Sequence, residues 1–300
     1  MRKTLLALLT LSLALLILAI PAGAISANQL GAQQISFTSN DNNWAGVAYS
    51  DTYSTLFGTG YNQIISALEF ITFSNLSLYY AGVTDPNSVS IWIAFSPYGV
   101  GPNSAKNIGK NFLQAGYGIA VYSNNEITLS YFVTGLNNGN VYYNYENYVP
   151  SGQISQLGVN LYYEPGGGTV EVGFNVFYEN GTNWHTILYV NWPWSNAPYS
   201  ALSIVEAPLY PLTDTLYELP YISGGMIYFS FGYTSNGNGY YGPGNPAPGT
   251  SIWAGVFNLN IQAPYNYAQA EIVNGWANYA GWDYLYQFYY PQSYAVDYGL

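Results

Sequence analysis

Residues 170–177 read VEVGFNVF and residues 127–133 read ITLSYFV, and these two stretches decide the fold class. In both, β-branched and aromatic residues alternate with small or polar residues, which is typical of a β-strand with one buried face. Asparagines and glycines follow each stretch within a few residues and favour a turn. Both stretches are therefore predicted to be strands joined to their neighbours by short turns.

Further stretches of the same kind indicate that most of the chain is β-structure. They are residues 88–95, 186–190, 226–231 and 251–259. Clusters of Gly, Asn and Pro separate them, such as Asn137–Gly139 and Gly166–Gly168. Many short strands without helical periods predict an all-β fold, either an antiparallel sandwich or a barrel.

The composition excludes several functional classes. Only 6% of the 300 residues are charged and 49% are hydrophobic, so disorder driven by charge is ruled out. Cysteine is absent and His185 is the single histidine, which excludes disulfides, thiolate chemistry and a zinc site with several histidines. Four basic residues against 15 acidic ones argue against a nucleic-acid partner.

The N-terminus resembles a secretion signal. Arg2 and Lys3 precede an apolar run over Thr4–Ile20, and Ala22–Ala24 has the small residues of a cleavage site. Residues 1–24 are therefore predicted to be a cleaved signal peptide of a secreted protein. The alternative is a retained anchor that associates the protein with the membrane or cell surface.

Cleavage would leave two lysines against 15 acidic residues, a net charge of −13 near neutral pH. In strong acid, where carboxylates are protonated, such a chain carries little charge and little self-repulsion. The composition therefore suits an acidic environment, although a polar extracellular coat would have a similar composition.

The rest of the chain divides into three segments by composition. Residues 25–40 are predicted to be an extended linker or pro-segment, residues 41–262 the β-sandwich domain, and residues 263–300 an aromatic extension. A short helix is predicted near Ala268–Ala277, and the extension either packs on the sandwich or serves surface attachment. Two glycosylation sequons begin at Asn75 and Asn180, which fits an exported glycoprotein.

Two polar residues are candidates for chemistry. Glu206 ends the predicted strand 201–206 and shares a face with apolar residues, and Gln114 shares a face with Phe112 and Gly116. Taken alone, each is more simply explained as a solvated residue at a strand edge.

Five motifs, two of which contain Gln114 or Glu206, follow one another along the chain in a fixed order. They are Asn42–Gly46 (NNWAG), Ile91–Ala94 (IWIA), Leu113–Gly116 (LQAG), Asn144–Tyr148 (NYENY) and Ala201–Glu206 (ALSIVE). This ordered set resembles the motifs of the glutamic peptidases, or eqolisins, over about residues 42–261.

The chain also departs from that family. Phe95–Pro97 stands where the family has an acidic Ile-Asp-Gly, and Asn144 and Asn147 replace tryptophans beside Glu146. Leu202 replaces the first Glu of the family's last motif, and the family's disulfides are absent. These differences bear on substrate preference and activation, while the positions of the catalytic Gln and Glu remain.

The resemblance implies a bent sandwich of two antiparallel sheets, a concanavalin-like jelly roll, with its site on the concave sheet. Glu206 would be the general base that activates water, and Gln114 would stabilise the oxyanion of the tetrahedral intermediate. Trp44, Trp92 and Glu146 would line the substrate groove. The expected protein is a monomeric acid endopeptidase that cleaves unfolded polypeptides without a metal or cofactor.

Two other readings remain open. Glu146 and Glu206 would form a retaining glycosidase pair if their carboxyl groups lay about 5–5.5 Å apart, on a sheet whose aromatic residues stack sugars. Alternatively, the chain is a non-catalytic surface protein with a large exposed aromatic patch. The distances between Gln114, Glu146 and Glu206 on the folded sheet are expected to separate these readings.

Overall fold

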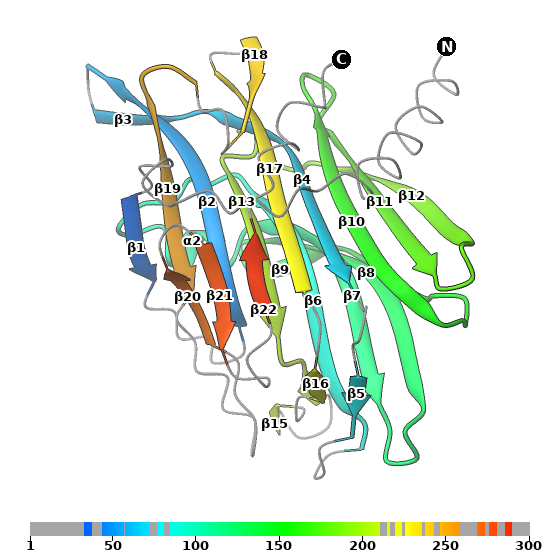
Figure 1. Cartoon of the computed structure of the whole chain (residues 1–300). Helices are drawn as coiled ribbons and strands as arrows, with labels where there is room; N and C mark the ends of the chain where they lie inside the picture. Colours follow the sequence, from blue (N-terminus) through cyan, green and yellow to red (C-terminus); the bar gives the residue numbers. More distant parts are fainter. Residues whose placement is uncertain are drawn as a thin grey trace.

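The protein is an antiparallel β-sandwich of two large sheets, seen in a computed structural model (Figure 1). The structure describes residues 33–37, 44–56, 58–72, 77–80, 85–210, 215–216, 220–223, 226–235, 238–242, 247–257, 269–273, 276–280 and 286–289. The predicted signal segment 1–24 lies outside these residues. Among the described residues, no helix has the length and apolar character needed to cross a membrane.

The first sheet, called sheet A, has nine strands in the order β1-β19-β2-β13-β6-β7-β8-β9, with β3 paired to β2. All of its pairs are antiparallel except β1 with β19. Its strands are β1 (Gln33–Phe37), β2 (Trp44–Thr55), β3 (Gly58–Tyr61), β6 (Asn87–Ser96), β7 (Phe112–Val121), β8 (Ile127–Asn137), β9 (Asn140–Tyr148), β13 (Ser200–Glu206) and β19 (Thr250–Phe257).

The second sheet, called sheet B, has the order β12-β11-β10-β4-β17-β22-β21-β20, with β18 paired to β17. Only the β17–β22 pair is parallel in this sheet. Its strands are β4 (Gln63–Thr72), β10 (Ile154–Glu164), β11 (Thr169–Tyr178), β12 (Asn183–Asn191), β17 (Met226–Ser235), β18 (Asn238–Tyr241), β20 (Gln269–Val273), β21 (Trp276–Ala280) and β22 (Tyr286–Tyr289). Two small pairs complete the fold: β5 (Ser77–Tyr79) with β16 (Tyr221–Ser223), and β14 (Leu209–Tyr210) with β15 (Thr215–Leu216).

The main core lies between the two sheets. Alternate residues of the central strands point into it, such as Val89, Ile91 and Ile93 of β6, which is the pattern expected for strands with one buried face. The hydroxyl of Tyr117 on β7 links the sheets by donating to the carbonyl oxygen of Gly158 on β10 at 2.8 Å. The hydrophobic alternation in the sequence therefore fixes which face of each strand meets the opposite sheet.

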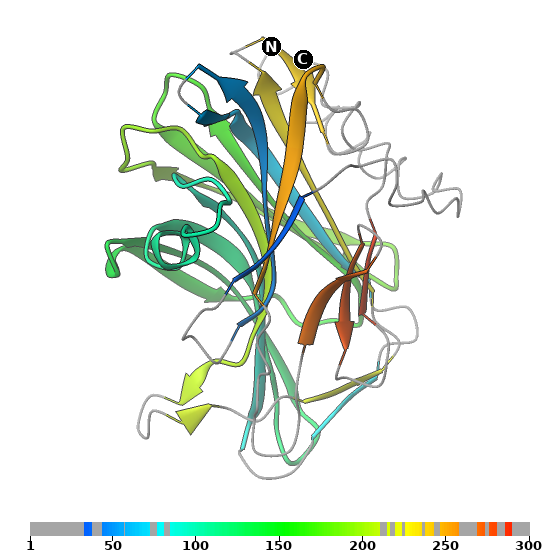
Figure 2. The same cartoon turned by 90° about the vertical axis from the view of Figure 1, so that its left-hand side faces the viewer.

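Sheet A has a second buried cluster on its other face. Trp44, Trp92 and Phe112 form its aromatic part, and Leu202 and Ile204 of β13 pack beside them. The short helix α2 (Ala105–Ile108) contributes the buried Ile108 to the same cluster. Figure 2 shows α2 on one side of sheet A and the strands β20–β22 on the opposite side. Part of this outer face is thus an aromatic surface covered by the segment between β6 and β7.

The predicted strands are confirmed, with ends that differ by a few residues. The stretch 170–177 lies within β11 and the stretch 127–133 within β8. The short helix predicted near Ala268–Ala277 is wrong, because residues 269–273 and 276–280 are the strands β20 and β21. The pair β17–β22 attaches this region to sheet B.

Candidate functional site

Glu206 is the last residue of β13, in the middle of sheet A. Its neighbours in register are Trp44 on β2 and Ser90 on β6. The indole Nε1–H of Trp92 donates to Glu206 Oε2 at 2.7 Å, across a sequence separation of 114 residues. The Glu206 side chain remains partly exposed. The indole hydrogen bond fixes one carboxylate oxygen in place, while the side chain stays accessible to solvent and to a ligand.

Trp92 is wholly buried, at 0% exposure, so it contacts Glu206 and cannot pack on a substrate side chain. Its ring stacks on Phe112 with centroids 5.8 Å apart, and Trp44 meets it edge-on at 5.1 Å. Trp44 itself is only 7% exposed. The two predicted substrate-lining tryptophans are therefore mainly packing residues. Trp44 and Phe112 pack against Trp92, and Trp92 is the hydrogen-bond donor to Glu206.

Gln114 lies on the same outer face as Glu206, along a diagonal of the sheet. Ile204, next but one to Glu206, pairs with Trp92, and Gln114 pairs with Ala94, next but one to Trp92. Glu206, Trp92 and Gln114 thus occupy three adjacent strands, each step one strand across and two residues along. Gln114 Oε1 is buried and has no hydrogen-bond partner among the described residues.

Glu206 and Gln114 are two diagonal steps apart on the outer face of sheet A. Diagonal neighbours in a sheet are about 7–8 Å apart, so Glu206 and Gln114 would lie about 15 Å apart on a flat surface. Trp44 and Phe112 lie on a parallel diagonal and are separated by three strands and six residues in register. Their ring centroids are nevertheless 5.5 Å apart. Both rings also contact Trp92, with centroids 5.1 and 5.8 Å from it, so these long side chains converge over this part of the sheet.

Glu146 is exposed on β9, at the edge of sheet A. It pairs with Phe132 on β8, and the register through β7 and β6 places it four strands from Glu206. Four strand spacings amount to about 19 Å, far above the 5–5.5 Å of a retaining glycosidase pair. In register, Glu146 lies beside Phe132, and Glu206 lies beside Trp44 and Ser90.

The segment between β6 and β7, which covers part of the outer face of sheet A, could not be recognised from the sequence. Val100 and Ile108 from this segment pack in the outer cluster, and Gly139 N donates to Lys110 O at 2.9 Å. The sequence signal for α2 is weak because the helix has only four residues. Among the described residues, no group of three or more His, Asp or Glu side chains gathers where a metal ion could bind.

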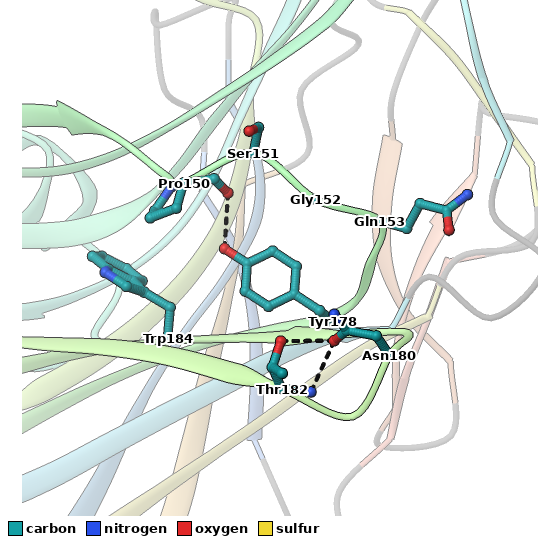
Figure 3. Close-up of a pocket in the computed structure, with 8 residues that line it drawn as sticks. All are labelled: Pro150, Ser151, Gly152, Gln153, Tyr178, Asn180, Thr182 and Trp184. Atoms are coloured by element: carbon teal, nitrogen blue, oxygen red, sulfur yellow. Dashed lines mark hydrogen bonds between the residues drawn. The ribbon is translucent and has the colours of Figure 1, made fainter.

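A second feature is a cavity of about 270 Å³ at one end of the sandwich, distant in sequence from the Glu206 site (Figure 3). Trp184 on β12 and Tyr178 at the end of β11 provide aromatic surface, and the Tyr178 hydroxyl donates to Pro150 O at 2.8 Å. The remaining lining is neutral and polar, and consists of Ser151, Gly152, Gln153, Asn180 and Thr182. The sequon residue Asn180 lies in the exposed β11–β12 turn, where its Oδ1 accepts from the Thr182 hydroxyl at 2.7 Å.

Comparison with known proteins gives similarity of fold alone. No protein-family model matches the chain, and no curated protein matches it. Among solved structures, the alginate lyase Aly36B has 12% identity and a TM-score of 0.31, covering 58% of this chain and 72% of the lyase. A mutant of that lyase with alginate trisaccharide has 10% identity and a TM-score of 0.32, covering 70% and 91%. Peanut lectin with a nine-residue peptide has 15% identity and a TM-score of 0.26, covering 57% and 85%.

Proposed function

We propose that the protein is an acid endopeptidase of the glutamic type, with Glu206 and Gln114 as its catalytic residues. The observation that carries the proposal is the hydrogen bond from Trp92 Nε1 to Glu206 Oε2 at 2.7 Å. It holds a partly exposed carboxylate on the same face of sheet A as Gln114, whose Oε1 has no partner among the described residues. The ordered motifs around both residues support the same assignment.

The proposed reaction is the addition of water to a peptide carbonyl. Glu206 accepts a proton from the water while the water oxygen attacks the carbonyl carbon. The carbonyl oxygen becomes an oxyanion. The amide N–H of Gln114 donates to this oxyanion. Glu206 then returns the proton to the amine nitrogen as the C–N bond breaks. An amide donor suits acid conditions, because its ability to donate does not depend on pH.

The test is cleavage of a denatured protein over a range of acid and neutral pH by wild type, Glu206→Gln and Gln114→Ala. Activity that is highest in acid, insensitive to chelators and lost with Glu206→Gln is expected. Removal of one oxyanion donor by Gln114→Ala should lower kcat about 10²–10³-fold. Equal cleavage by all three proteins, or none by folded wild type, would refute the proposal. Glu164→Gln, at an exposed position on β10, is the matched control.

A second candidate function is binding of a neutral carbohydrate in the cavity between Pro150 and Trp184. The observation that favours it is the lining, which combines two aromatic rings with amide and hydroxyl groups and contains no charged residue. Sugars bind to such surfaces through stacking and neutral hydrogen bonds. Titration with maltotriose should change the fluorescence of wild type but not of Trp184→Phe. An unchanged wild-type signal, with no heat of binding in calorimetry, would reject this candidate.

A further inference from the structure

Glu69 is a carboxyl group buried in the centre of the sandwich, apart from the candidate site. It lies on β4 in sheet B, between Val159 of β10 and Phe229 of β17 in register. Its exposure is 0%. Ala67 and Ile71, two residues away on the same strand, are also buried in the main core. An acidic side chain at this position would be expected to have a compensating partner.

The partner of Glu69 is on the opposite sheet. Ser203 Oγ donates to Glu69 Oε2, and Ser203 lies on β13 with an exposure of 0%. The other oxygen, Oε1, is buried and has no hydrogen-bond partner among the described residues. The Glu69–Ser203 pair thus spans the two sheets, and one carboxyl oxygen is left without compensation.

No opposite charge lies near this carboxyl in the described part of the chain. The main core around it consists of apolar residues and tyrosines, and its titratable members are Tyr49, Tyr117, Tyr131, Tyr163 and Tyr233. Asp51 is the only other buried acidic or basic residue described, and it lies on β2 four residues along from Val47, the register partner of Ser203. A negative charge on Glu69 would therefore be both desolvated and unpaired.

We propose that the Glu69–Ser203 pair is an acid-dependent clasp between the sheets, stable while the carboxyl holds its proton and weakened when the proton is lost. A protonated carboxyl can donate as well as accept, so it suits a core without cations. The ionised form loses hydration and gains no partner for Oε1. The clasp makes folding itself sensitive to pH, whether or not Glu206 is catalytic.

The direction of the pH effect follows from the burial. Desolvation raises the pKa of Glu69 from 4.5 to about 8, against a smaller opposing effect of the Ser203 hydrogen bond. The native state therefore retains a proton that the unfolded state releases. The stabilising contribution is complete below the unfolded pKa and is lost as the pH rises toward 8. Between these values the folding equilibrium constant should fall about tenfold per pH unit, or about 300-fold by pH 7.

The experiment is urea unfolding of wild type, Glu69→Gln and the control Glu164→Gln at a series of pH values from 4 to 9. The amide of Glu69→Gln has nearly the same shape and does not titrate. The difference in stability between wild type and Glu69→Gln should change by about 1.4 kcal/mol per pH unit, which is the tenfold factor per unit. Any contribution from Asp51 is common to both proteins and cancels. The unfolding free energy of the control Glu164→Gln should vary with pH as that of wild type does.

A second measurement keeps the proposal testable if Glu69→Gln does not fold. The infrared carbonyl band of a protonated carboxylic acid should persist at pH 6 in folded Asp51→Asn, where Asp51 cannot contribute, and should disappear on unfolding at that pH. Parallel stability curves for wild type and Glu69→Gln would overturn the clasp. So would the absence of the protonated band from folded Asp51→Asn at pH 6.

Discussion

Removal of one donor from the candidate site should separate catalysis from packing. Trp92→Phe keeps an aromatic ring beside Phe112 but deletes the Nε1–H that donates to Glu206 Oε2 at 2.7 Å. Hydrogen bonds to charged groups contribute about 1.5–3 kcal/mol. If this bond positions Glu206 in the transition state, kcat/KM should fall about 10- to 150-fold.

The same substitution should also reduce stability, because the smaller ring leaves space at a position with 0% exposure. We expect a loss of about 1–3 kcal/mol, less than the ~3–5 kcal/mol of truncation to alanine. The matched control is Trp192→Phe. Trp192 is 5% exposed, lies in the main core, and donates from Nε1 to the backbone oxygen of Asn196 at 2.7 Å.

The assay is the pH profile of kcat/KM on a denatured protein, with urea unfolding in parallel. Both variants should lose similar stability, but only Trp92→Phe should lose activity under conditions where it is fully folded. The acidic limb of the Trp92→Phe pH profile should also move toward higher pH, because the ionised Glu206 carboxylate has lost a hydrogen-bond donor. Wild-type kcat/KM in folded Trp92→Phe, or equal losses in both variants, would refute the positioning role.

Three further predictions concern the scaffold. Gly116→Ala should lower the free energy of unfolding in urea by about 1–3 kcal/mol or more, because the alanine Cβ would overlap Trp92 Cβ and the backbone oxygen of Ile91. An unchanged urea midpoint would contradict this close packing. Gly139→Ala should cost about 1 kcal/mol or more, since φ is 79° at this turn position, and unchanged stability would show that the turn relaxes. Burial raises the pKa of Asp51, so the free energy of unfolding should fall as the pH rises above the ordinary carboxyl range. Asp51→Asn should reduce that fall. Equal slopes of unfolding free energy against pH in the two proteins would show that Asp51 does not contribute to it.

The strands could be predicted from the sequence because their pattern is local. The stretch VEVGFNVF alternates between core and outer positions, and β11 contains all of it. The turn Asn137–Gly139 was also recognisable, since Asn138 and Gly139 adopt positive φ of 51° and 79° in the tight β8–β9 connection. Local chemistry determines such features whatever the rest of the chain does.

The partners of the strands could not be predicted in the same way. Residues 269–273 contain alanine, glutamine and glutamate, which favour a helix, yet they pair as β20 with β21. Pairing and burial override such weak local preferences. The contact between Trp92 and Glu206 depends on the register of β6 with β13 across a separation of 114 residues. The motifs singled out both Trp92 and Glu206 but gave no indication that the indole donates to the carboxylate.

Strand β13 carries the proposed base Glu206 and also contacts the buried carboxyl of Glu69. Its alternation sends Ser203 into the main core, where it bonds Glu69, and places Ile204 in the outer cluster beside Trp92. Glu206 lies at its end, on the same outer face. The strand that carries the proposed base is thus also the strand joined to sheet B through a carboxyl that needs its proton. Protonation would oppose the proposed activity at Glu206 and support the fold at Glu69. The two effects have opposite signs, so if Glu206 is the proposed base, activity should be confined to the pH range in which Glu206 is ionised and Glu69 is protonated.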